Sequence, residues 1–174
     1  WAGLGRARVA LGCLFLTGIP LVPVLEFMGV MGPFQVLDAL ITQGLLGFVG
    51  IESVRSGVVL SLSHGAIEID SGCSSLIPLW LLGKLAMGWA LVVNLSWSQG
   101  LGLVIAALGI AFGVNGIRLC LLAVLSEPAQ AADFYFWHQG GGAELCSTVA
   151  IVAFGLVAGW MYYRRERDQT PVED

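Results

Sequence analysis

The sequence predicts an all-α protein, a polytopic transmembrane bundle of four to five helices with a short extracytoplasmic β-hairpin-like segment. Of the 174 residues, 57% are hydrophobic and 11% are charged, whereas an average soluble domain carries about 25% charged residues. The mean hydropathy is +0.85, and apolar runs recur at lengths that suit a hydrocarbon core about 30 Å thick. These three observations exclude an ordinary water-soluble domain.

The first expected span covers residues 9–28, which follow Arg6 and Arg8. This apolar run is too long for the central part of a typical signal peptide, and no small-residue cleavage site follows it. Because the chain begins at Trp1 rather than at Met, we also expect further N-terminal spans to be missing.

A second helix is expected over residues 34–49, which include Gln35, Asp38 and Gln43. A transmembrane helix needs about 20 predominantly apolar residues. This segment is short and polar, so the sequence leaves open whether it crosses the membrane, lies at the interface, re-enters or packs inside the bundle.

Residues 51–70 have a different pattern, in which Val58, Leu60 and Leu62 occupy alternate positions. His64 and Gly65 then separate this run from a second short one. Alternation around a glycine turn is typical of a β-hairpin, which we place outside the hydrocarbon.

Three further apolar segments are each long enough to cross the bilayer: residues 76–93, 101–125 and 143–163. The basic residues Arg164, Arg165 and Arg167 follow the last segment, and the positive-inside rule places them in the cytoplasm. Since successive spans alternate in direction, the loops 51–75 and 126–142 are expected to share the outer face.

We expect residues 1–174 to form one integral membrane domain, because four or five spans leave no room for a folded soluble domain. The net charge is −4 and no long basic run occurs, so the expected partner is the lipid bilayer and nucleic acid is excluded. The four cysteines show neither a CxxC nor a His-rich spacing, and no structural metal site or disulfide framework is predicted.

Cys73 stands where the predicted hairpin meets the outer end of the helix over residues 76–93. A thiol near a helix N-terminus experiences a dipole that favours the thiolate, which indicates a nucleophile. The alternative is a small, half-buried packing residue. Cys13, Cys120 and Cys146 lie in apolar runs and are expected to pack.

Arg118 lies within the apolar segment 101–125, three residues after Asn115 and on the same helical face. An arginine within a membrane helix costs about 2.5 to 3.5 kcal/mol on insertion scales, so it needs a polar partner or a wet cavity. A structural ion pair is the alternative to a functional role.

His138 closes the second outer loop and is the preferred candidate base, whereas His64 lies in the predicted hairpin turn, where a solvated role is expected. A thiol, an imidazole and a guanidinium on one face of the bundle are the groups that acyl transfer by a cysteine requires.

Three motifs together resemble the exosortase and archaeosortase family: GCSSL at residues 72–76, NGIRL at residues 115–119, and His138 followed four residues later by Gly142. The resemblance extends over residues 34–160. One position departs from the family pattern, because Ser75 stands where these proteins usually have glycine after Cys-Ser. Family members also commonly have about eight spans.

The resemblance implies a cysteine peptidase and transpeptidase of the plasma membrane, with its active site on the extracytoplasmic face. Cys73, Arg118 and His138 would be the catalytic residues, and no metal or organic cofactor is expected. The implied partners are exported proteins that end in a short motif, an apolar helix and a basic cluster. Such an enzyme cleaves this sorting signal and passes the product to an acceptor through a thioester.

The alternative function is a noncatalytic polytopic membrane subunit or transport component. In that protein Arg118 would make a structural ion pair and Cys73 would only pack.

Overall fold

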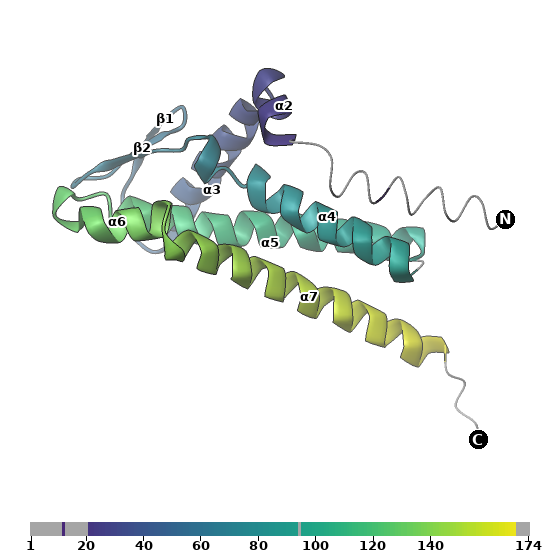
Figure 1. The fold of residues 1–174 in the computed structure, drawn as a ribbon. Helices are drawn as coiled ribbons and strands as arrows, with labels where there is room; N and C mark the ends of the chain where they lie inside the picture. Colours follow the sequence, from purple (N-terminus) through teal and green to yellow (C-terminus); the bar gives the residue numbers. More distant parts are fainter. Residues whose placement is uncertain (1–11, 13–20, 94, 170–174) are drawn as a thin grey trace.

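A computed structural model describes residues 12, 21–93 and 95–169 of the chain (Figure 1). The helices are α2 (Leu21–Phe27), α3 (Met31–Phe48), α4 (Leu76–Val93), α5 (Trp97–Val124), α6 (Ala131–His138) and α7 (Gly141–Gln169). The strands are β1 (Val54–Ser56), β2 (Val59–Ser61) and β3 (Ala66–Glu68), and two short 3-10 helices are η1 (Ser71–Cys73) and η2 (Pro128–Gln130).

The predicted helical character is confirmed, and α3, α4, α5 and α7 match the four helices expected from residue 34 onwards. Two described helices, Trp97–Val124 and Gly141–Arg167, are long and apolar enough to cross a membrane, and Leu76–Ala90 is a shorter apolar helix. The described residues thus supply two candidate spans where four to five were predicted. Most of the span expected at residues 9–28, with Cys13, lies outside the described residues.

The predicted hairpin is part of a larger element, an antiparallel sheet of three strands in the order β1-β2-β3. The turn at His64 and Gly65 joins β2 to β3 as expected, but β1 precedes them and pairs with β2. The sequence pattern missed β1 because Val54, Arg55 and Ser56 do not alternate between apolar and polar side chains. Gly57 makes the tight turn between β1 and β2. Its φ of +64° lies in the left-handed region, which few residues other than glycine adopt.

The sheet packs on the end of the helical bundle, over α3 and α5. Its buried side chains, Leu60 and Ile67, join Leu46, Leu119 and Leu122 in one apolar cluster. A Cβ at Gly65 would lie only 2.4 Å from Ser126 Oγ, so glycine permits the close approach of the sheet to the end of α5.

A second apolar cluster joins α4, α5 and α7 in the long part of the bundle. Its members are Leu82, Ala86, Leu103, Ala107, Ala111, Phe154 and Ala158. Small residues at such contacts let helix backbones approach closely, as in membrane proteins.

The loops 51–75 and 126–142 lie at one end of the bundle, whereas the C-terminal end of α7 lies at the opposite end (Figure 1). Arg165 donates from Nη1 to the carbonyl oxygen of Val93, 2.9 Å away, and thereby joins the far ends of α7 and α4. The two loops lie at the same end, as the prediction that they share one face of the membrane requires. The second loop differs from the expectation in one respect, because it contains η2 and α6.

Candidate active site

The turn that carries Cys73 is fixed by Asp70. Asp70 is the N-cap of η1, and its Oδ1 accepts a hydrogen bond of 2.8 Å from the backbone N–H of Cys73. Aspartate is among the preferred N-cap residues because its carboxylate satisfies an otherwise unpaired N–H group. The turn holds Cys73 just before α4, with 2% of its surface exposed.

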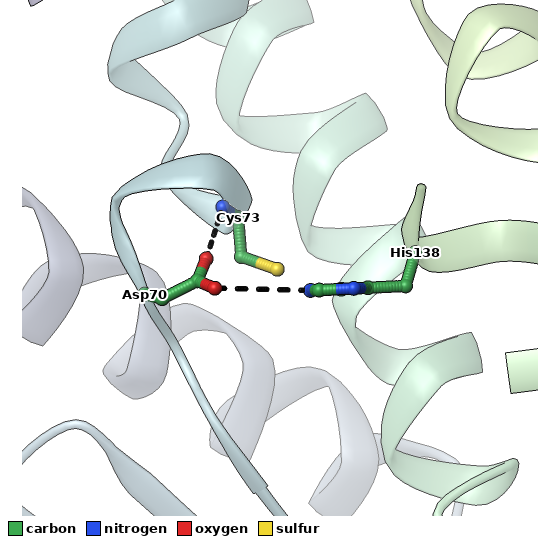
Figure 2. Close-up of side chains that lie close together, drawn as sticks. All are labelled: Asp70, Cys73 and His138. Carbon is green, nitrogen blue, oxygen red and sulfur yellow. Dashed lines mark hydrogen bonds and ion pairs between the residues drawn. The ribbon is translucent and has the colours of Figure 1, made fainter. Parts of the chain in front are cut away.

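His138 is the last residue of α6 and faces this turn (Figure 2). Its ring stacks on Phe134 with 5.4 Å between ring centroids, and its Nε2 lies 3.9 Å from Asp70 Oδ2. One ligand-type atom from each of Asp70, Cys73 and His138 lies within 4.8 Å of the other two. The structure therefore brings the predicted thiol and imidazole together and adds a carboxylate to them.

Asp70 was not predicted as a site residue. The signal available in the sequence is an aspartate three residues before the cysteine, the spacing of an N-cap to the N–H it accepts. That pattern predicts a local turn, but only the tertiary fold brings the second carboxylate oxygen to His138.

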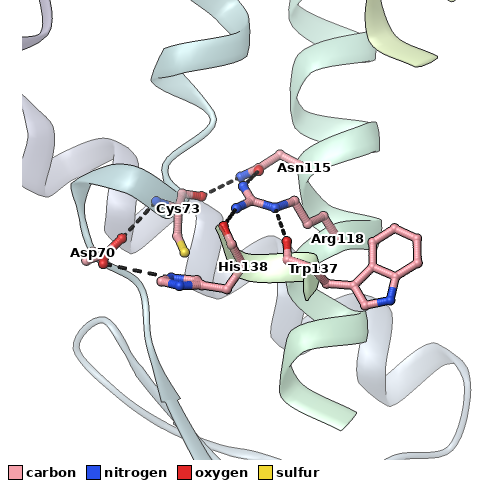
Figure 3. A network of polar contacts seen from close by, with 6 residues as sticks. All are labelled: Asp70, Cys73, Asn115, Arg118, Trp137 and His138. Atoms are coloured by element: carbon pink, nitrogen blue, oxygen red, sulfur yellow. Dashed lines mark hydrogen bonds and ion pairs between the residues drawn. The ribbon is translucent and has the colours of Figure 1, made fainter. Parts of the chain in front are cut away.

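Arg118 holds the C-terminal end of α6 (Figure 3). Its Nε donates to the carbonyl oxygen of Trp137 at 3.1 Å, and its Nη2 donates to that of His138 at 2.6 Å. These are carbonyls of the last helical turn, which have no partner within their own helix. Arg118 thus positions His138 through the backbone, and the five N–H groups of a guanidinium leave donors for another group.

Asn115 lies one turn before Arg118 and contacts it, as their shared helical face predicted. Asn115 also contacts the turn that carries Cys73. Its Oδ1 is 3.5 Å from Arg118 Nη1, and its Nδ2 donates to the carbonyl oxygen of Cys73 at 2.8 Å. Asn115 is therefore the described side chain that joins the turn of the thiol to the arginine.

A cavity of about 250 Å³ lies beside the Cys73 turn, between α4, α5, α6 and α7. Arg118 and His138 line it together with Gly72 and Ser74, the two neighbours of Cys73. Residues of α4 and α7 complete the wall, among them the polar residues Glu144 and Ser147 of α7. Cys146, which was expected only to pack, also lines this cavity.

The turn between α6 and α7 has no room for side chains at Gly140 and Gly142. A Cβ at Gly142 would lie 2.6 Å from Trp137 Cε3, and one at Gly140 would lie 2.9 Å from the carbonyl oxygen of Phe136. Real Cβ contacts are not this short. The glycine run after His138 is thus required for α7 to begin directly against α6.

The other predicted residues lie elsewhere. His64 is exposed in the loop between β2 and β3, where its Nε2 is 3.2 Å from the carbonyl oxygen of Val124. Cys120 is half-buried on α5, with its thiol 3.7 Å from the carbonyl oxygen of Thr42. Neither belongs to the group formed by Asp70, Cys73 and His138.

The prediction that the helix dipole favours a Cys73 thiolate is wrong. The pKa of this thiol is raised to about 12, chiefly by burial and also by the negative charge of Asp70, whereas the positive charge of Arg118 lowers it. Desolvation disfavours the charged form, and it is the largest contribution to the raised pKa of Cys73. The resting thiol is therefore protonated at neutral pH.

We expect Cys73 to be alkylated slowly at pH 8 and about tenfold faster per pH unit toward the raised pKa, because only the thiolate reacts. Asp70→Asn should speed this labelling, because it removes a negative charge that raises the pKa of the thiol. The measurement is the iodoacetamide reaction rate at Cys73, followed by peptide mass spectrometry. Labelling at neutral pH as fast as that of an ordinary thiol would contradict the expectation.

Asp70, Cys73 and His138 are also of the residue types that bind zinc. Zinc lies about 2.0 to 2.3 Å from such ligands, so atoms spread over 4.8 Å would have to contract around the ion. Asp70 Oδ1 is already used by the Cys73 N–H group. The arrangement fits a nucleophile, a base and a carboxylate at least as well as it fits a metal centre.

The long apolar helices and the grouped cysteine, histidine and aspartate define a class, a membrane protein with a cysteine–histidine site. A family model described as Transmembrane exosortase matches residues 1–156. The chain therefore belongs to the transmembrane exosortase family, which confirms the resemblance found in the motifs. Neither the curated proteins nor the solved structures contain a match.

Proposed function

We propose that the chain is a membrane cysteine peptidase and transpeptidase that cleaves C-terminal sorting signals of exported proteins. The observation that carries the proposal is the approach of Cys73, His138 and Asp70 beside a cavity that His138 and Arg118 line. Membership of the exosortase family supports the same reaction class. We further propose that residues 1–174 act as one membrane domain.

In the proposed first step, His138 removes the thiol proton as Cys73 Sγ attacks the carbonyl carbon of the scissile peptide bond. Concerted proton removal suits a thiol whose pKa is raised to about 12, because a free thiolate is scarce. The carboxylate of Asp70, 3.9 Å from Nε2, stabilises the imidazolium that forms.

The tetrahedral intermediate then collapses and breaks the carbon–nitrogen bond. The leaving amine takes its proton from the His138 imidazolium, and the N-terminal product stays on Cys73 as a thioester. An acceptor amine, hydroxyl or water attacks the thioester, with His138 taking the acceptor's proton and returning it to the sulfur. No metal or organic cofactor enters these steps.

Arg118 has two tasks in this proposal. Its bonds to the carbonyl oxygens of Trp137 and His138 position the base. Its remaining N–H groups stabilise the oxyanion or hold the peptide carbonyl, which suits a fixed positive charge at the cavity. The backbone N–H of Cys73 does not serve the oxyanion, because it is bonded to Asp70.

A trapped acyl-enzyme tests the function. The chain is expressed with an exported protein of the same genome that ends in a short motif, an apolar helix and a basic cluster. We expect a covalent adduct on Cys73 that hydroxylamine releases, as a thioester requires. If the chain binds this substrate but forms no adduct and leaves it uncleaved, the result would favour the alternative of a noncatalytic membrane subunit.

We propose that the site faces the outside of the plasma membrane. The support is α7, which carries Arg164, Arg165 and Arg167 at one end and begins beside His138 at the other. The positive-inside rule assigns the basic end to the cytoplasm. The exported proteins that we propose as partners would reach the cavity laterally from the bilayer.

Single introduced cysteines test this orientation. A membrane-impermeant thiol reagent applied to intact cells should label a cysteine placed at position 64 or 139, and not one placed at position 168. The read-out is the mass shift of each variant in a background without the native cysteines. Labelling at position 168 alone would invert the bundle and contradict an enzyme that acts outside the cytoplasm.

A further inference from the structure

Asp38 is a buried carboxylate that the steps above do not use. It lies on α3 with 2% of its surface exposed, in contact with the residue two positions after Cys73. Asp38 Oδ2 accepts a hydrogen bond of 2.8 Å from the backbone N–H of Ser75, and Oδ1 accepts one from the Ser75 hydroxyl. A carboxylate in a buried site needs such donors, and both come from one residue at the start of α4.

The direction of these bonds is determined by donor and acceptor chemistry. The amide Nδ2 of Asn115 lies 3.1 Å from Ser75 Oγ and can only donate. The carboxylate of Asp38 accepts, so the Ser75 hydroxyl donates to Asp38 and accepts from Asn115. The Ser75 hydroxyl therefore has one acceptor, Asp38, and one donor, Asn115.

Asn115 extends the network to the reacting residues. The same amide nitrogen donates to the carbonyl oxygen of Cys73 at 2.8 Å, and its oxygen faces Arg118 Nη1 at 3.5 Å. Asp38 thus orients Ser75, Ser75 orients Asn115, and Asn115 contacts the backbone that carries the thiol.

We propose that Asp38, acting through the Ser75 hydroxyl, is a positioning residue that holds Asn115 and the Cys73 turn in the geometry of attack. This inference rests on the proposed function. It also assigns a role to Ser75, which stands where glycine is usual in the family, because glycine has no hydroxyl to donate to Asp38.

Asp38→Asn removes one of the two acceptors that Ser75 needs, while the side chain keeps its size. The amide must then point an N–H group at a donor or at the already occupied Ser75 oxygen. We expect the rate of acyl-enzyme formation to fall about 100-fold, the loss typical of a misplacement of about 1 Å. KM should stay within about threefold, because Asp38 does not line the substrate cavity.

Ser75→Ala tests the path of the effect. It removes the hydroxyl but keeps the backbone N–H that Asp38 also binds. If Asp38 acts through this hydroxyl, the double variant Asp38→Asn, Ser75→Ala should lose no more than the worse single variant, because contacting residues in one network are not additive. Should Asp38→Asn fail to fold, Ser75→Ala alone must still lower kcat with KM retained.

The matched control is Thr42→Val, one helical turn along α3. Thr42 is also buried, but its hydroxyl donates to the carbonyl oxygen of Asp38 at 2.7 Å and is not part of the hydrogen bonds that join Asp38, Ser75 and Asn115. This variant should keep the rate per folded molecule, with folding checked by thermal melting. For all variants, kcat and KM are measured by substrate cleavage with the purified protein in vesicles.

Two results would overturn the inference. One is a kcat per folded molecule that is unchanged in both Asp38→Asn and Ser75→Ala. The other is independent, additive losses in the double variant. Cys73→Ala, run in parallel, keeps the two proposals apart, since an active Cys73→Ala variant contradicts the function itself and not the role of Asp38.

Discussion

Replacing Cys73 with alanine should abolish processing of the sorting signal while the protein remains folded and inserted. Cys73 is the thiol that His138 and Asp70 face, so no other described cysteine can replace it in that group. Loss of a covalent nucleophile costs on the order of a millionfold in turnover, which lies below detection in a cell assay. The measurement is the appearance of cleaved substrate on a gel, with thermal melting as the test of folding.

Cys146→Ala and Cys120→Ala are the matched controls. Cys146 is the sharper control because it lines the same cavity but lies outside the group around the imidazole. Both variants should process substrate at nearly the normal rate. Normal cleavage by Cys73→Ala, or its loss in Cys146→Ala alone, would contradict Cys73 as the nucleophile.

His138→Ala should lower the rate of acyl-enzyme formation about 100- to 10,000-fold, the range expected for a general acid or base. The effect should be large here because the Cys73 thiol, with its pKa raised to about 12, cannot supply enough thiolate without a base. The measurement is single-turnover cleavage by the purified protein in vesicles, which separates the chemical step from product release.

His64→Ala is the control for that prediction. His64 is exposed, and its ring contacts the carbonyl oxygen of Val124 at the end of α5 and not the Cys73 turn. It should leave the single-turnover rate close to normal. The opposite ranking of the two histidines would remove His138 from the proposed mechanism.

The helices were predictable because apolar runs of membrane length leave a strong signal. The expected helix at 76–93 has the bounds of α4, whereas α5 begins four residues earlier than the expected residue 101. The cause is a capping box in which Ser96 and Gln99 bond each other's backbone N–H groups. A capping box can be recognised from residues three positions apart, so the start of α5 was predictable from the sequence.

The acidic residues of the site were less predictable. Cys73, Arg118 and His138 are unusual for their surroundings in the sequence, so each one attracts attention alone. Asp70 and Asp38 acquire their roles only when separate segments meet, at His138 and at Ser75 respectively. Hydrophobic periodicity cannot predict these contacts, because they depend on how α3, α4 and α6 pack against one another.

The crowded glycine turn between α6 and α7 couples the position of His138 to the start of α7. Because a side chain at Gly142 would overlap Trp137, the start of α7 and the end of α6 move together. His138 lies at that junction, while Cys73 belongs to the segment leading into α4. The separation of the His138 imidazole and the Cys73 thiol is therefore set by the tilt of α7 against α4. In the mechanism proposed above, a substrate helix that enters between these helices from the lipid would change the distance of proton transfer.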